Sequence, residues 1–157
     1  MAYSNTDIPK MPPATEIIRR RPRMFFEDGI PTAEYMLERI LRDARHVDPT
    51  ATALSAGSYS AVFANADWLR SRWANFNELF ERIVPDGIEP NGCRGEVFLT
   101  ALGCPVMTVG HGPQYSRRLK ISEVSGDIAN AAKAAQRGLI WRFDPDSDEI
   151  KELLSNR

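Results

Sequence analysis

Cysteine and histidine are scarce in this chain, and their scarcity excludes two kinds of protein. The 157 residues include only two of each. A small secreted domain held by disulfides would carry many more cysteines, so we expect a reducing compartment. A structural zinc site needs about four such ligands, and no C-x-x-C or H-x-x-x-H spacing joins the four available residues, so no metal site is expected. They are Cys93, Cys104, His46 and His111.

Long apolar runs and a strong net charge are also missing. No run approaches the roughly 20 apolar residues that span a bilayer, and residues 1–7 lack the basic and apolar regions of a secretory signal. The formal net charge is −1, which gives no electrostatic support for DNA or an anionic membrane as the partner. These absences predict a cytoplasmic protein that does not bind membranes.

What the chain does have is the composition of an ordinary globular domain. Hydrophobic residues make up 43% of the sequence and charged residues 26%, close to the average for soluble domains. The length favours one domain. Residues 1–16 contain three prolines without apolar periodicity, which indicates a loosely held segment. We therefore expect a flexible arm over residues 1–16 and a single domain over residues 17–157.

Two stretches have the apolar spacing of a helix. Residues 33–47 are the clearer one, because Thr32 is suited to the N-cap and Asp48-Pro49 ends the helix. A second buried stripe is predicted between residues 69 and 83, where large apolar residues recur with 4-3-4-3 spacing. Its members are Leu69, Trp73, Phe76, Phe80 and Ile83.

The remaining segments alternate between strand and helix signals. A hairpin around Gly57 is predicted over residues 52–63, and a second hairpin over residues 106–121. Residues 139–143 read as a strand, residues 97–102 and 148–154 as short helices, and residues 129–136 as either a helical turn or a loop. Helices mixed with antiparallel hairpins predict an α+β sandwich.

Four local strings, in this order, resemble the N-terminal ATPase domain of the DNA gyrase B and topoisomerase IV B subunits, a GHKL family. Residues 17–28 (IIRRRPRMFFED) are similar to the family string V-R-K-R-P-G-M-Y-I-G-D. Residues 56–66 (AGSYSAVFANA) are similar to its hairpin, D-G-S-x-x-V-x-D-N-G. Residues 92–102 (GCRGEVFLTAL) are similar to the glycine-rich lid and its helix, and residues 138–146 (GLIWRFDPD) to the strand G-T-x-V-x-F-x-P-D. The resemblance implies a two-layer sandwich, with a mostly antiparallel or mixed sheet covered by helices on one face.

The resemblance also implies where ATP would bind, and there the sequence departs from the family. The first helix should carry a catalytic Glu and, four residues later, an Asn for Mg²⁺. Here the pair is either Glu38 with Arg42 or Arg39 with Asp43, and we leave this register open. An arginine at the metal position would repel Mg²⁺, which prefers oxygen ligands. Glu38 could act as a base, but an i, i+4 ion pair with Arg42 on the helix surface is the favoured interpretation.

The other positions that contact nucleotide in the family are altered as well. The Asp that reads adenine falls on Ala64, beside Asn65, and one of the following glycines falls on Trp68. The lid keeps Gly92 and Gly95 without the full G-x-x-G-x-G pattern, which leaves fewer backbone amides to cradle phosphate. The family threonine is replaced by Leu139. ATP hydrolysis by the family mechanism is therefore not expected, and no catalytic residue, cofactor or metal is assigned.

The altered nucleotide-binding positions predict a non-catalytic interaction or regulatory protein. Its partner is expected to be another protein or a second copy of the chain. Two alternatives remain open. One is a nucleotide- or small-molecule-binding domain with a rebuilt pocket, and the other is a relative or fragment of a topoisomerase B subunit. Loops on a rigid scaffold often carry recognition, so the arm and residues 86–95 are the expected contact surfaces. The arginines expected to meet acidic groups of a partner are Arg19, Arg20, Arg21 and Arg23.

Overall fold

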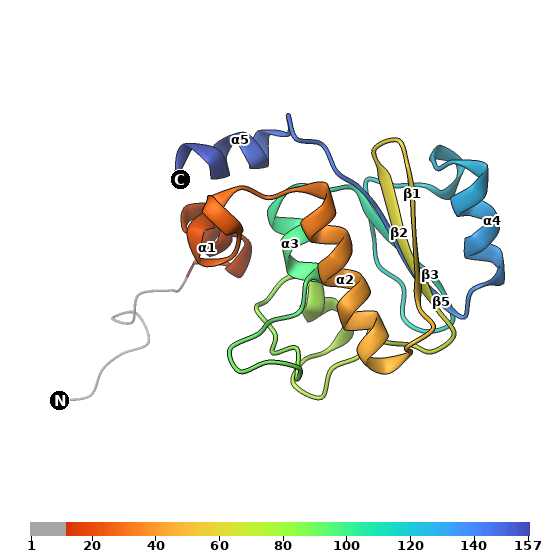
Figure 1. The fold of residues 1–157 in the computed structure, drawn as a ribbon. Helices are drawn as coiled ribbons and strands as arrows, with labels where there is room; N and C mark the ends of the chain where they lie inside the picture. Colours follow the sequence, from red (N-terminus) through yellow and green to blue (C-terminus); the bar gives the residue numbers. More distant parts are fainter. Residues whose placement is uncertain (1–11) are drawn as a thin grey trace, which may run out of the picture.

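The computed structural model describes residues 12–157 and contains an antiparallel sheet with helices on both of its faces (Figure 1). The strand order is β1-β2-β5-β3-β4, and all four pairings are antiparallel. The strands are β1 (Thr52–Ala56), β2 (Tyr59–Ala64), β3 (Val106–Gly110), β4 (Ser116–Arg117) and β5 (Arg137–Arg142). The α+β class and the antiparallel sheet predicted from the sequence are confirmed.

Five helices accompany the sheet within residues 12–157. They are α1 (Ala14–Arg20), α2 (Ala33–Val47), α3 (Glu96–Ala101), α4 (Gly126–Ala134) and α5 (Asp148–Ser155). Short 3-10 turns cover Pro22–Met24, Glu27–Gly29, Phe76–Phe80 and Ile121–Glu123. Helix α2 has the predicted bounds, and the Thr32 hydroxyl accepts a hydrogen bond from the Tyr35 N–H at its start. Within residues 12–157 no helix is long and apolar enough to cross a bilayer.

Most of the core lies between the sheet and helices α1, α2, α3 and α5. Helix α2 packs on β1 and β2, while α1 packs against α3 and α5. Val62, Leu139 and Trp141 face this layer from the sheet, and all three are fully buried. The aromatic residues Phe26 and Phe98 meet within it, with ring centroids 5.2 Å apart.

The opposite face of the sheet is covered by α4, which corrects the prediction of helices on one face only. Ala61 and Phe63 of β2 and Ile140 of β5 pack there against Ile128 of α4. The cause is visible in β5, whose residues Gly138, Leu139, Ile140 and Trp141 are all buried. A strand that is apolar on both sides needs cover on both faces. The alanine-rich stretch left open as a turn or a loop provides that cover.

The helical stripe predicted between residues 69 and 83 is wrong. Leu69 and Phe80 are buried, but Trp73 is 48% exposed and Ile83 is 42% exposed. Residues 65–75 form no helix, and the short turn Phe76–Phe80 begins only after Asn75. The Arg94 guanidinium accounts for this, because it donates to the carbonyls of Trp68 and Arg70, both at 2.9 Å. A helix would need those carbonyls for its own N–H groups.

The expected arm falls mainly on residues 1–11, which lie outside the described residues. Residues 14–16, also assigned to the arm, belong instead to α1. This helix is anchored by Ile18, which is fully buried.

Candidate functional site

Helix α2 turns Arg39, Arg42 and Asp43 toward residues 84–96 and leaves Glu38 exposed. The predicted Glu38–Arg42 pair is wrong, because Arg42 instead contacts Asp86 at 3.0 Å and Glu89 at 3.2 Å. The side chains that face the expected lid are therefore Arg39 and Asp43, with Arg42 at the border. Sequence spacing could not choose between the two registers, because the choice depends on which side of α2 residues 84–96 cover.

Asp86 holds the segment after Pro85 against α2. Its side chain is fully buried, and it contacts the guanidinium groups of Arg42 at 3.0 Å and Arg39 at 3.5 Å. It also accepts hydrogen bonds from the N–H groups of Ile88 and Glu89. Burial acts to raise the pKa of Asp86, but the two amide hydrogen bonds and the two arginines outweigh burial and leave this pKa lowered. Asp86 is therefore an anion at neutral pH that binds both arginines.

Arg94 is the second centre of the network. Its side chain is nearly buried and pairs with the fully buried carboxylate of Glu96, with 3.2 Å between Arg94 Nε and Glu96 Oε2. Asp43 Oδ2 lies 3.7 Å from Arg94 Nε. Together with its two hydrogen bonds to the carbonyls of Trp68 and Arg70, Arg94 ties α2, α3 and the irregular segment before residue 76 to one another.

Asp43 is the least satisfied member of this network. Its Oδ2 accepts a hydrogen bond from the Gly95 N–H at 3.0 Å, whereas its Oδ1 is buried without a hydrogen-bond partner among the described residues. Burial, followed by the neighbouring carboxylate of Glu96, raises the pKa of Asp43 to about 7. Two carboxylates sharing one arginine thus leave Asp43 able to gain or lose a proton near neutral pH.

Gly95 is needed for the close approach of this loop to α2. A Cβ atom added there would lie 2.9 Å from Arg39 Cγ. Gly92 packs in the same way against the Asp86 carboxylate. Both lid glycines found in the sequence therefore serve backbone packing against charged side chains of the same chain.

The position expected to read adenine is apolar, and the neighbouring polar residue lies at the surface. Ala64 is buried at the end of β2, and Asn65 is exposed with its N–H donated to Asp48 Oδ2 at 2.7 Å. Trp68 and Leu139 are fully buried in the main core. The indole of Trp68 therefore fills space in the core.

A polar cavity of about 320 Å³ opens beside this network. It lies between the second half of α2 and the loops of residues 70–73 and 85–87. Arg72 stacks over the Trp73 ring at 4.4 Å, while Asp43 and Arg94 are buried members of the lining. The cavity combines exposed cationic and aromatic groups with a carboxylate whose pKa is near neutrality. Such a set can form hydrogen bonds and exchange a proton with a small polar molecule.

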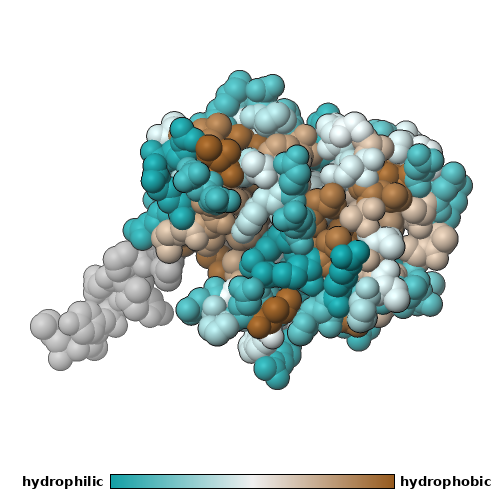
Figure 2. All heavy atoms as spheres, viewed as in Figure 1, coloured by the Kyte–Doolittle hydropathy of each residue, from teal (hydrophilic) through white to brown (hydrophobic). Residues whose placement is uncertain are grey.

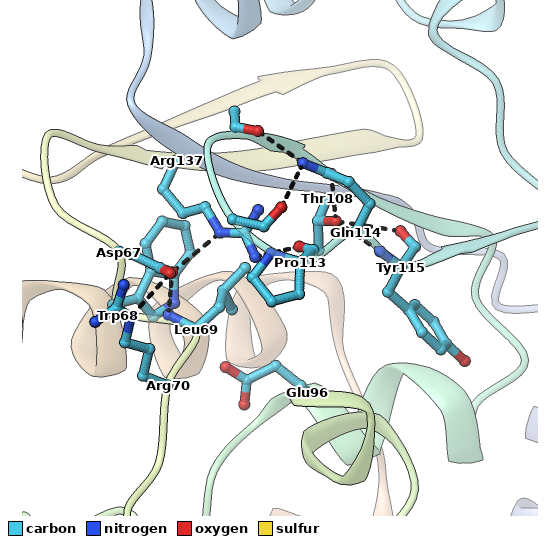
Figure 3. A network of polar contacts seen from close by, with 12 residues as sticks. Asp67, Trp68, Leu69, Arg70, Glu96, Thr108, Pro113, Gln114, Tyr115 and Arg137 are labelled. Atoms are coloured by element: carbon cyan, nitrogen blue, oxygen red, sulfur yellow. Dashed lines mark hydrogen bonds and ion pairs between the residues drawn. The ribbon is translucent and has the colours of Figure 1, made fainter. Parts of the chain in front are cut away.

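A separate network fixes the start of β5 (Figure 3). The fully buried Arg137 donates to Asp67 at 3.0 Å and to the carbonyl of Pro113. Figure 3 shows Asp67 pointing toward both Arg137 and the backbone of Leu69, while Gln114 braces the loop that follows β3. We assign this network a structural role.

The structure divides the four arginines near the N-terminus. Arg19 pairs with Glu152 at 3.4 Å and donates to the Ala101 carbonyl at 3.2 Å. Arg20 forms an ion pair with Glu16. Arg21 and Arg23 are exposed and have no ion-pair partner among residues 12–157. Of the four, these two have guanidinium groups without an ion pair to residues 12–157, and they lie close to Met24, which is 68% exposed.

Sequence reasoning found both glycines and Asp43 but missed Asp86, Arg94 and Glu96. The contacts between α2 and residues 84–96 join positions more than 40 residues apart, so no local spacing indicates them. Within the described residues, no group of three or more His, Cys, Asp or Glu side chains is arranged to hold a metal ion.

Figure 2 shows that hydrophobic surface on the viewed face is divided into patches among hydrophilic residues. Comparison of the chain with models of known protein families, with curated proteins and with solved structures found no match.

Proposed function

We propose that this chain is a non-catalytic interaction or regulatory protein, built on a gyrase-B-like GHKL fold that has lost ATP hydrolysis. The observation that carries this proposal is the ionic network between α2 and residues 84–96. In the resembled family this side of the helix holds a water-activating carboxylate and a magnesium ligand. Here Arg39 and Arg42 bind Asp86, and Asp43 lies beside Arg94.

The charges of this network also oppose a magnesium ion. A site for Mg²⁺ needs oxygen ligands that are free to bind it. Asp86 already forms ion pairs with two arginines and accepts hydrogen bonds from two backbone amides, and both oxygens of Glu96 contact Arg94. The burial of Trp68 likewise argues against binding of the adenine base of a nucleotide.

The partner surface that the structure favours is the segment around Arg21, Arg23 and Met24. Arginine is enriched among the residues that dominate protein interfaces, and methionine is over-represented at interfaces. Arg19 and Arg20 are occupied within the domain. Residues 86–95 are the second surface, although Asp86 already fixes the backbone of that loop.

The test is the capture of a partner by the full chain and by matched charge-reversal variants. A captured partner is first purified and shown to rebind the parent chain. We expect the double change Arg21→Glu and Arg23→Glu to abolish binding of this partner. The melting temperature of the double variant should equal that of the parent. Arg20→Glu is the control, because its partner Glu16 lies on the same helix. Equal rebinding by the parent and by the double variant would exclude this surface. Failure of the parent to bind any purified candidate would count against an interaction role.

The cavity beside Asp43 favours a second candidate function, the binding of a small polar molecule in a rebuilt pocket. The observation behind it is the unpartnered Asp43 Oδ1 among the residues that line the cavity. Ligand-observed NMR with a set of small polar compounds would test it. We expect a true ligand to bind differently at pH 6 and pH 8, and to lose that difference in Asp43→Asn. Binding that does not change in this variant would place the ligand elsewhere.

A further inference from the structure

Within residues 12–157, strand β1 forms one end of the sheet and pairs only with β2. The two-residue turn of Gly57 and Ser58 joins them, with Ala56 opposite Tyr59. In an antiparallel pair, residues that exchange hydrogen bonds alternate with residues that do not, and the pair next to a two-residue turn exchanges them. Ala56, Leu54 and Thr52 therefore exchange hydrogen bonds with β2. The backbone N–H and C=O groups of Ser55 and Ala53, which alternate with them, point away from β2.

These outward groups have no partner in the described chain. No described hydrogen bond outside the ladder uses the backbone N–H or C=O of Ala53 or Ser55. Ser55 is exposed, as are Thr52 and Leu54. In Figure 1, α2 and α4 lie on opposite sides of the β1–β2 hairpin, and they pack on the faces of the sheet. Against residues 12–157, the edge therefore leaves two donors and two acceptors without a partner.

The two edges of the sheet differ in how they are protected. Natural edge strands are usually very short, charged or interrupted by proline, which prevents pairing with other chains. Strand β4 has such protection, since it is only two residues long, contains Arg117, and is followed by Arg118 with φ of 58°. Strand β1 is five residues long, and residues 49–66 contain no charged side chain and no proline after Pro49.

Strand β1 is also complementary to itself. An antiparallel two-fold axis at Leu54 places Ala53 of each copy opposite Ser55 of the other. Each Ala53 then exchanges two backbone hydrogen bonds with Ser55 of the other copy, which gives four hydrogen bonds in all. The two Leu54 side chains, each 36% exposed in the monomer, meet on the α4 side as a non-hydrogen-bonded pair, the closer kind of pair. Strand β1 has no charged side chain, so it brings no like charges together in this arrangement.

We propose that β1 is a homodimer interface, in which two copies of the chain join their sheets edge to edge through residues 52–56. A strand from another protein could use the same backbone groups. The small side chains of Ala53 and Ser55 offer it no charge to recognise, whereas a second copy satisfies the edge by symmetry. This inference does not depend on the proposed loss of ATP hydrolysis.

Sedimentation velocity of the full chain over a range of concentrations, combined with hydrogen exchange, tests the proposal. We expect a reversible dimer in the parent and in Ser55→Ala, which keeps the backbone N–H. Ser55→Pro removes only an outward N–H, and Leu54→Lys places two cations opposite each other. Both should be monomeric at concentrations where the parent is dimeric. If Ser55→Pro fails to fold, Leu54→Lys decides.

In the parent, exchange at the Ala53 and Ser55 amides should slow as concentration rises. A parent that stays monomeric at millimolar concentration would overturn the proposal. So would a dimer in which these two amides exchange equally fast at every concentration, because such a dimer uses another surface. Persistence of the dimer in Leu54→Lys would overturn it as well.

Discussion

The β1–β2 hairpin and the contact between α2 and residues 84–96 are built in opposite ways. Residues 49–66 contain no charged side chain, and the hairpin is held by its ladder and by apolar packing on both faces. The second region buries Asp43, Asp86, Arg94 and Glu96. Apolar packing tolerates changes of shape as long as volume is kept. A buried ion pair becomes strongly unfavourable when one partner is removed. The two regions should therefore respond differently to substitution and to pH.

The largest effect is expected from Arg94→Ala, which breaks the charged region at its centre. The variant leaves Asp43 and Glu96 buried without their shared cation and removes the partner of two backbone carbonyls. Loss of one member of a buried ion pair destabilises by about 3–5 kcal/mol. Urea denaturation measures this loss, which should be greater at pH 8 than at pH 5. Arg70→Ala is the control, because Arg70 is mostly exposed and surface pairs contribute about 1 kcal/mol or less.

A loss below about 1 kcal/mol in Arg94→Ala would mean that the network is not closed in solution. The comparison between the two regions would then fail.

The next effect is expected from Ile140→Ala, which opens the apolar region. Ile140 is fully buried where the sheet meets α4, and truncating such a residue destabilises by about 2–5 kcal/mol. This loss of unfolding free energy should be the same at pH 5 and pH 8, because the substitution leaves no ionisable group buried without its partner. Ile121→Ala, at an exposed site, should change the free energy of unfolding by less than about 1 kcal/mol. A pH-dependent loss in Ile140→Ala would contradict the proposed difference between the regions.

A smaller effect is expected from the titration of Asp43. Its pKa is raised in the folded protein to about 7, against about 4 in the unfolded chain. Between these values the folded state binds the proton more tightly, so stability falls as pH rises from 5 to 8. The change attributable to Asp43 over this range is on the order of 2–3 kcal/mol. The lowered pKa values of Asp48, Glu78 and Asp86 act mainly below pH 4.

Asp43→Asn should remove this pH dependence. The free energy of unfolding of the variant should therefore increase relative to that of the parent as pH rises. Unfolding curves of both proteins at several pH values would show it. Parallel pH profiles would mean that Asp43 does not titrate in this range.

The two regions also differ in how far the sequence predicts them. The sequence predicts the β1–β2 hairpin, α2 and strand β5 close to their observed bounds, because each has its own local pattern. The stripe from Leu69 to Ile83 has an equally regular pattern and is wrong, since Arg94 takes the carbonyls that a helix would need. The cover of α4 on the second face was missed because an alanine-rich segment has little periodicity.

For the candidate site, the sequence predicts which residues are replaced relative to the resembled family but not what replaces their contacts. Asp86 and Arg94 stand in loops whose charges look solvent-exposed in the sequence. Their burial depends on partners in α2 and in residues 68–70. Arg20 and Arg21 are neighbours of the same type, yet only Arg20 has a described ion-pair partner.

Calorimetric titration of the full chain with Mg-ATP tests the central claim most directly, namely that the ionic network and Trp68 occupy the place of a nucleotide. We predict no heat beyond dilution and no release of phosphate on prolonged incubation, because Asp86 and Arg94 already bind the groups that a nucleotide would need. A dissociation constant in the micromolar range would contradict the account.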